Sequence, residues 1–178
     1  MKKYLVIGNP IEHSLSPQLH NYWIKKNNIN AVYDKKQLNK NNIEEIINEV
    51  KNGNLVLGAD SIINLKEKII SKPSNRDEAL AILQKLNGQK HQLISSVCIS
   101  KNGSMIWNYT DIAVLTMKQM NNQELKSYLT KIKDKELYAY NVYQIEGEGK
   151  SLFSNIEGDE NTIMGLPIKQ IKEYLKSL

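Results

Sequence analysis

The segment His91-Gln92-Leu93-Ile94-Ser95-Ser96-Val97-Cys98-Ile99-Ser100 leads through Lys101-Asn102-Gly103 into a second β-rich segment at 104–117. Both segments are rich in residues that favour strands, and the Asn-Gly pair accepts the positive φ angles of a tight turn. The sequence therefore predicts an antiparallel hairpin over these residues.

Strands and helices are predicted to alternate on both sides of this hairpin. Ser74, with Asp77 three residues later, resembles the capping box of a helix that ends at Asn87-Gly88. We expect a mixed α/β fold, in which a mixed sheet is flanked by helices. Strands are predicted at 3–8, 31–34 and 55–57, a second hairpin from 152–156 and 162–164, and further helices from Ser16, Asn41 or Asn42, Asn121 or Asn122, and Pro167.

The composition excludes several classes of protein. No run approaches about 18 consecutive apolar residues, so no membrane-spanning helix is expected. Cys98 is the single cysteine, which excludes an intrachain disulfide and fits a reduced cytoplasmic setting. The formal charge is +5, but the lysines are scattered, so nucleic acid is not an expected partner. Arg76 is the single arginine, so any phosphate site must depend on lysines.

Local setting alone marks four candidate residues. Asp60 follows the strand predicted at 55–57, where a carboxylate binds a divalent cation, acts as a general base, or only turns the chain. Lys72 precedes a helix N-terminus, where it either meets a phosphate or is a solvated loop residue. Ser14 and Ser16 begin another helix, where they hold a carboxylate or phosphate, or Ser16 is a simple N-cap.

The segment Glu146-Gly147-Glu148-Gly149 combines two carboxylates with flexible backbone. It either lines a pocket or turns the chain, and it fits neither a P-loop nor a dinucleotide-binding fingerprint. The three histidines, His13, His20 and His91, do not have the spacing of metal ligands.

Residues 1–53 resemble the N-terminal substrate-binding part of shikimate dehydrogenase. The resemblance is carried by Val6-Ile7-Gly8-Asn9-Pro10-Ile11, His13-Ser14-Leu15-Ser16-Pro17 and His20-Asn21. It implies that Ser14 and Ser16 hold a substrate carboxylate. The sequence never reaches the Asn-Val-Thr-x-Pro-x-Lys segment of that family, its catalytic aspartate or its nicotinamide-binding domain, so dehydrogenase activity is not expected.

Residues 54–178 resemble the Maf family of nucleoside triphosphate pyrophosphatases. This implies a Maf-like, ITPase-related architecture in which residues 1–53 form a substituted N-terminal βαβα segment. The motifs that carry the resemblance are Leu57-Gly58-Ala59-Asp60-Ser61, Lys72-Pro73, Glu78-Ala79, Leu83, Leu86-Asn87-Gly88, His91, Tyr143-Gln144-Ile145-Glu146-Gly147, Ile156-Glu157-Gly158-Asp159 and Gly165-Leu166-Pro167.

The Maf resemblance implies cleavage of a nucleoside triphosphate to its monophosphate and pyrophosphate. Asp60 would activate water near Mg²⁺ or Mn²⁺, and Lys72 would bind phosphate. Ser61 and Glu146 occupy the positions linked to base selectivity, and Glu146 is similar to the branch acting on 7-methyl-GTP, because a carboxylate accepts from guanine N1–H and N2–H₂. A homodimer is common in this family.

The resemblance is broken at one loop. Maf proteins begin with a Ser-x-Ser-x-Arg-Arg loop that grips the phosphates, whereas Gln18 and Leu19 stand here where those arginines would be. Each lost charge-assisted hydrogen bond costs roughly 1.5–3 kcal/mol. The sequence therefore leaves three alternatives: a pyrophosphatase of full or impaired activity, a non-catalytic small-molecule binding module, and a fusion without function.

Overall fold

The hairpin predicted at 91–117 forms the two longest strands of the molecule, β5 (Lys90–Lys101) and β6 (Ser104–Met117). Asn102 and Gly103 turn the chain with φ angles of 52° and 79°, as the Asn-Gly signal predicts. The structure is a computed structural model that describes residues 1–8, 11, 16–37, 41, 43–53, 55–134, 137, 141–145 and 147–178.

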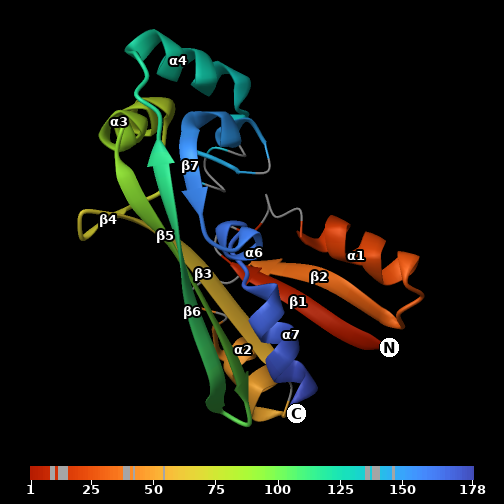
Figure 1. Ribbon diagram of the computed structural model, residues 1–178. Helices are drawn as coiled ribbons and strands as arrows, with labels where there is room; N and C mark the ends of the chain where they lie inside the picture. The colour runs from red at the N-terminus through yellow and green to blue at the C-terminus, as the bar shows by residue number, and fades with distance from the viewer. Residues whose placement is uncertain are drawn as a thin grey trace.

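The hairpin is the centre of a five-stranded antiparallel sheet, whose other strands are β3 (Val56–Leu65), β4 (Lys68–Ile70) and β7 (Phe153–Glu157). The strand order is β4-β3-β5-β6-β7 (Figure 1). Alternate residues of β5 are buried, from His91 to Ile99, because successive side chains of a strand point to opposite faces. One face therefore carries the core, and the other is largely open.

Two helices pack against the core face at one end of the sheet, α3 (Arg76–Leu86) and α4 (Asn122–Lys131). Figure 1 shows them side by side beyond the end of β6. They contribute apolar side chains at helical spacing to one buried cluster that includes strand residues. The members from the helices are Ala79, Ile82, Leu83, Leu86, Leu125, Tyr128 and Leu129, and those from the sheet include Ile63, Leu93, Leu115 and Met117.

Both helices begin with an asparagine cap. Asn121 forms the predicted start of α4, in a complete capping box with Glu124. For α3 the predicted pair was wrong by one residue at each end: Asn75 accepts from the backbone N–H of Glu78 at 2.8 Å, while the Glu78 carboxylate accepts from Ser74. Glutamate reaches back to the chain before the helix, which the shorter Asp77 side chain does not do here.

The second predicted hairpin was wrong. Its first half is β7, which pairs with β6, but 160–163 form a short helix, α6 (Glu160–Ile163). The Asp159 side chain accepts from the N–H groups of Asn161 and Thr162 at 2.9 and 3.3 Å, so an N-cap replaces the expected turn. The last predicted helix is confirmed as α7 (Ile168–Lys176), and a 3-10 turn, η1 (Glu148–Leu152), precedes β7.

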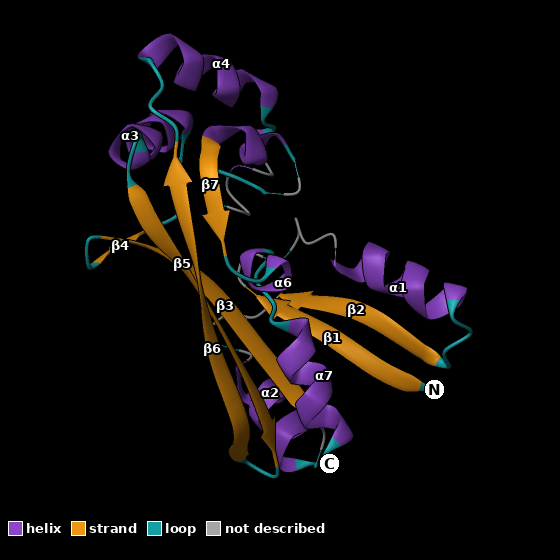
Figure 2. Ribbon diagram, in the orientation of Figure 1, coloured by secondary structure: helices purple, strands orange, loops and turns teal. Residues whose placement is uncertain are grey.

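The N-terminal elements form a second, two-stranded sheet (Figure 2). Here β1 (Lys2–Gly8) and β2 (Ala31–Gln37) are parallel, and α1 (Ser16–Lys26) connects them. The Asn21 side chain of α1 forms two hydrogen bonds with the backbone of Tyr33: it donates to the carbonyl oxygen at 2.6 Å and accepts from the N–H at 2.8 Å. The next helix is α2 (Ile43–Lys51). The division of the chain at residue 53 stays a prediction.

The mixed α/β class predicted from the sequence is confirmed, with an antiparallel main sheet, a separate parallel pair of strands and flanking helices. Within the described part of the chain, none of the helices has the length and apolar character needed to cross a membrane.

Candidate functional site

Asp60 lies in the middle of a strand, not after one. β3 continues from Val56 through Gly58-Ala59 to Leu65, so the predicted strand end at residue 57 was wrong. Gly58 does not interrupt the strand because it pairs with Cys98, and a Cβ at residue 58 would lie 3.3 Å from the cysteine sulfur. The sequence signal that suggested a turn is therefore a close contact between strands.

The Asp60 carboxylate is exposed on the open face of the sheet. Its Oδ1 accepts from the backbone N–H of Ser61 at 2.9 Å. Asp60 pairs with Ser96 of β5, which pairs with Thr110 of β6, and the hydroxyl groups of Ser96 and Thr110 are 2.8 Å apart. Paired residues share a face, so this carboxylate stands in a row with two hydroxyl groups. The carboxylate oxygens suit a hard divalent cation, and a hydroxyl group of this row can donate to a phosphate oxygen.

Ser61 faces the other way, because it is the next residue of the same strand. Its hydroxyl oxygen lies 2.7 Å from that of Ser95, which is fully buried on the core face. Ser95 in turn donates to the carbonyl oxygen of Thr162 in α6 at 2.8 Å, and the Thr162 hydroxyl donates to Asp111 at 2.6 Å. Asp60 and Ser61 thus present their side chains to opposite faces of the sheet.

Sequence reasoning missed Ser95, Asp111 and Thr162. One signal was available, since Ser95 occupies a core position between Leu93 and Val97 in the alternating pattern of β5. A hydroxyl group at such a position needs a buried hydrogen-bond partner. The partners of Ser95 are Ser61, 34 residues earlier in the chain, and Thr162, 67 residues later, so no local pattern reveals them.

Lys72 is exposed in the connection between β4 and α3, next to the buried Pro73. In the described part of the chain it makes no ion pair. The start of α3 is occupied by the protein's own carboxylate, since hydrogen bonds from the backbone and hydroxyl of Ser74 lower the pKa of Glu78. A phosphate at this place would therefore meet Lys72 beside Glu78, rather than a vacant helix N-terminus.

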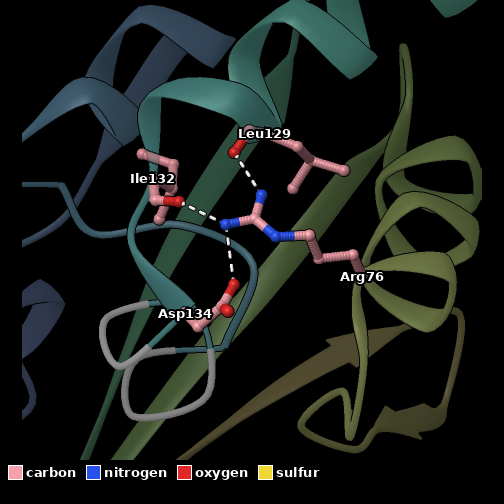
Figure 3. Close-up of polar contacts among 4 residues, drawn as sticks. All are labelled: Arg76, Leu129, Ile132 and Asp134. Atoms are coloured by element: carbon pink, nitrogen blue, oxygen red, sulfur yellow. Dashed lines mark hydrogen bonds and ion pairs between the residues drawn. The ribbon is translucent and has the colours of Figure 1, made fainter.

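Arg76 does not serve a phosphate site. Its guanidinium group donates to the carbonyl oxygens of Leu129 and Ile132 at 2.7 and 2.8 Å and pairs with Asp134 at 2.7 Å (Figure 3). These contacts join the start of α3 to the end of α4. The single arginine of the chain is thus used for helix packing, which leaves lysines as the cations available to phosphate groups.

A cavity of about 260 Å³ lies between the end of α4 and the loop around residue 146. Two buried tyrosines hold this loop: Tyr128 donates to the carbonyl oxygen of Val142 at 2.9 Å, and the Tyr143 hydroxyl lies 2.9 Å from His91 Nε2. Burial lowers the pKa of His91 to about 4 and raises the pKa of both tyrosines, so all three stay neutral near pH 7. The cavity is lined by Lys131, Ile132, Asn141, Val142, Tyr143, Gln144, Gly147, Glu148 and Gly149.

The remaining predicted site residues are not placed by the structure. Ser14 and Glu146 lie outside the described residues, and of Ser16 the structure describes the backbone, as the first residue of α1. Of the segment 146–149, Gly147, Glu148 and Gly149 line the cavity at the end of α4. Among the described residues, no three acidic, histidine or cysteine side chains gather closely enough to hold a metal ion.

Relatives of the chain share one activity in their names. A nucleoside triphosphate pyrophosphatase of Pelagibacter ubique (strain HTCC1062) is 73% identical over 122 residues, which are 68% of this chain and 63% of that protein. Another from Rhodopseudomonas palustris (strain BisB18) is 39% identical over 124 residues, 70% and 61% of the two chains. A 7-methyl-GTP pyrophosphatase of Brucella abortus biovar 1 (strain 9-941) is 35% identical over 130 residues, 73% and 65%.

This chain spans less than two thirds of the length of these relatives. Their names give no support to the dehydrogenase-like reading of residues 1–53. The model of a family described as Maf-like protein matches residues 13–178, and so begins well inside that segment. The chain therefore belongs to the Maf-like family.

Proposed function

We propose that the protein hydrolyses a nucleoside triphosphate to the monophosphate and pyrophosphate. The names of its relatives support this activity, and Asp60 is the observation in the structure on which the proposal rests. The residue is exposed, and one oxygen of its carboxylate is held by the N–H of Ser61. A carboxylate held in this way is suited to accept a proton from an attacking water molecule.

The donor set at Asp60 fits a divalent cation that takes most of its ligands from the substrate. Mg²⁺ commonly binds one or two protein carboxylates together with phosphate oxygens and water, and Asp60 supplies one carboxylate. Mg²⁺ or Mn²⁺, when bound, would reduce the negative charge of the triphosphate. We propose Lys72 as a phosphate-binding cation and Ser14 and Ser16 as hydroxyl donors to the substrate, with no dehydrogenase activity from the segment that carries them.

We further propose that Ser61 and Glu146 select the base. The Brucella relative is named for 7-methyl-GTP, and a carboxylate at residue 146 can accept from the N–H groups of a guanine ring. We also propose that the protein is cytoplasmic and that it forms a homodimer. Light scattering on the purified protein tests the homodimer.

Pyrophosphate release from 7-methyl-GTP, GTP, UTP and dTTP, with Mg²⁺ or Mn²⁺, tests the activity. We expect Asp60→Asn to lower kcat at least about 100-fold, as for loss of a general base. The matched control is Asp34→Asn, because Asp34 is also an exposed strand residue whose Oδ1 accepts from the next N–H, of Lys35 at 2.8 Å. Unchanged release by Asp60→Asn would refute the role of Asp60.

A non-catalytic binding module is the second candidate, and the use of Arg76 in helix packing favours it. Nucleotides that raise the melting temperature of the folded protein without any pyrophosphate release would support this function over hydrolysis.

A further inference from the structure

The positive charge of the chain is concentrated in its first 40 residues. Residues 1–40 contain seven lysines and two acidic residues, a formal charge of +5, which equals that of the whole chain. Residues 41–178 contain 17 basic and 17 acidic residues, obtained by subtracting 7 from 24 and 2 from 19. Averaged over the whole sequence the lysines look scattered, but one part of the chain carries all of the excess. Such an asymmetry indicates a partner that is itself a polyanion.

The fold brings four of these lysines to one end of the two-stranded sheet. β1 and β2 are parallel, so the start of β1 lies beside the start of β2, where Lys3 pairs with Val32. α1 ends with Lys25 and Lys26, and β2 begins five residues after the last of them, so both lie at this end as well. Figure 1 shows the same end, next to the N-terminus, extending away from the five-stranded sheet.

We call this end, formed by residues 1–4 and 21–33, the basic tip. Its sequence contains four lysines and no acidic residue. Lys3 and Lys25 are exposed, and neither forms an ion pair with another described residue. The basic tip therefore presents positive charge that the protein itself does not neutralise.

Aromatic rings accompany the lysines at the basic tip. Tyr22 is 59% exposed on α1, and Nζ of Lys26 lies 5.9 Å from the centre of its ring. Tyr4 is 45% exposed at the end of a ladder of stacked rings, in which its centre lies 6.4 Å from that of Tyr33, which stacks on His20 at 4.3 Å. Exposed rings beside lysines are the arrangement on which unpaired bases stack while their phosphate groups meet the cations.

We propose that the basic tip binds single-stranded nucleic acid, with its lysines on phosphate groups and with Tyr4 and Tyr22 stacked on bases. A duplex fits less well, because its bases are already stacked on one another. An anionic membrane also fits less well, because the side of α1 that faces β2 is held there by Asn21 and His20 and cannot insert between lipids. This binding is separate from the proposed hydrolysis and does not depend on it.

Fluorescence anisotropy of a labelled strand of about 20 deoxythymidines, with the full chain in EDTA, tests the proposal. Three or four phosphate contacts predict that affinity falls about 20- to 50-fold between about 50 and 200 mM NaCl. At the lower salt concentration, Lys3→Gln combined with Lys25→Gln should weaken binding at least about tenfold, and Tyr22→Ala about fivefold. The matched control is Lys172→Gln combined with Lys176→Gln in α7, which removes the same charge from exposed positions outside the basic tip and should change the affinity less than about twofold.

Four results would overturn the inference: no binding of the strand at low salt, equal losses in the two double variants, wild-type affinity in Tyr22→Ala, or equal affinity for a duplex of the same length. Binding to phosphatidylserine vesicles in place of the strand would assign the basic tip to a membrane instead. Pyrophosphate release is scored separately. Strand binding without release would refute the proposed hydrolysis alone, whereas release without strand binding would refute this inference alone.

Discussion

Arg76 Nη1 donates to the carbonyl oxygen of Leu129 at 2.7 Å, so the first residue of α3 caps the last turn of α4. The carbonyl oxygen of Ile132 and the carboxylate of Asp134 complete the contacts of the guanidinium group (Figure 3). The last carbonyl groups of a helix lack the N–H donors of a following turn. The planar guanidinium donates to one of them, that of Leu129, and at the same time to the carbonyl oxygen of the C-cap residue Ile132. The packing of the two helices on the core thus depends on the planar guanidinium group of Arg76.

The first prediction follows from this geometry. Arg76→Lys should lower the free energy of unfolding by about 1–2 kcal/mol, since an ammonium group cannot reach both carbonyl oxygens in the same way. Urea denaturation gives the value. Asp134→Asn is the control, because it removes the exposed ion pair alone and should cost less than about 0.5 kcal/mol. Equal losses in the two variants would show that the carbonyl contacts contribute nothing beyond the ion pair.

His91 should make stability depend on pH. Burial holds its pKa near 4, below the ordinary 6.5, so the unfolded chain takes up a proton between these values and the folded chain does not. The contribution of His91 to the free energy of unfolding is fully present above pH 6.5 and is lost as the pH falls toward 4. We expect the wild-type protein to lose about 2–3 kcal/mol more than His91→Gln between pH 7.5 and pH 4.5.

Urea denaturation of both proteins at the two pH values measures this difference. Burial also lowers the pKa of His20, and hydrogen bonds lower the pKa of Glu78 and Asp159. These groups are present in both proteins, so they cancel. Parallel pH profiles for the two proteins would contradict the prediction.

Gly149 should be essential to the shape of the loop that carries Glu146. A Cβ at residue 149 would lie 2.5 Å from the carbonyl oxygen of Gln144 and 2.6 Å from its nitrogen, which is a clash with backbone that cannot turn away. Gly149→Ala should therefore cost about 2–3 kcal/mol and alter the preference among nucleotides. Gly147→Ala is the matched control, since the nearest atoms are 3.8 Å from its Cβ. Melting temperatures and pyrophosphate release from GTP and UTP compare the two, and equal behaviour would exclude the close contact as the cause.

Features set by local chemistry were predictable from the sequence. Asn102-Gly103 fixes the turn between β5 and β6, and Asn121 begins α4, because each acts on residues within a few positions. The errors arose where contacts distant in sequence overrule local signals. Gly58 resembles the start of a turn, but it lies within a strand because it pairs with Cys98 of the neighbouring strand. The two residues are 40 positions apart in sequence, counted from 58 to 98.

The candidate site divides in the same way. Asp60 and Lys72 were recognisable from family motifs, but their faces and surroundings were not. Successive residues of a strand point to opposite faces of the sheet, so Asp60 and Ser61 do not share a face. The sequence did not reveal this, because it predicted that the strand ends at residue 57. The contact from Ser61 through Ser95 to Thr162 joins β3, β5 and α6, so it exists only after the chain has folded.

Substitution of Gly165 should separate an effect on ligand binding from an effect on stability. Gly165→Ala forces a side chain into a left-handed conformation and places its Cβ 3.3 Å from the Ser61 hydroxyl oxygen, so both folding and ligand approach should suffer. Gly103→Ala carries similar backbone strain, with a φ of +79°, but its Cβ would meet nothing closer than 3.9 Å. Both variants should therefore lose about 1 kcal/mol of stability, and Gly165→Ala alone should weaken GTP binding, by about tenfold. Urea denaturation and calorimetry on the two proteins give both quantities. If Gly165→Ala binds GTP as tightly as Gly103→Ala does, the space beside Ser61 is not where the ligand approaches.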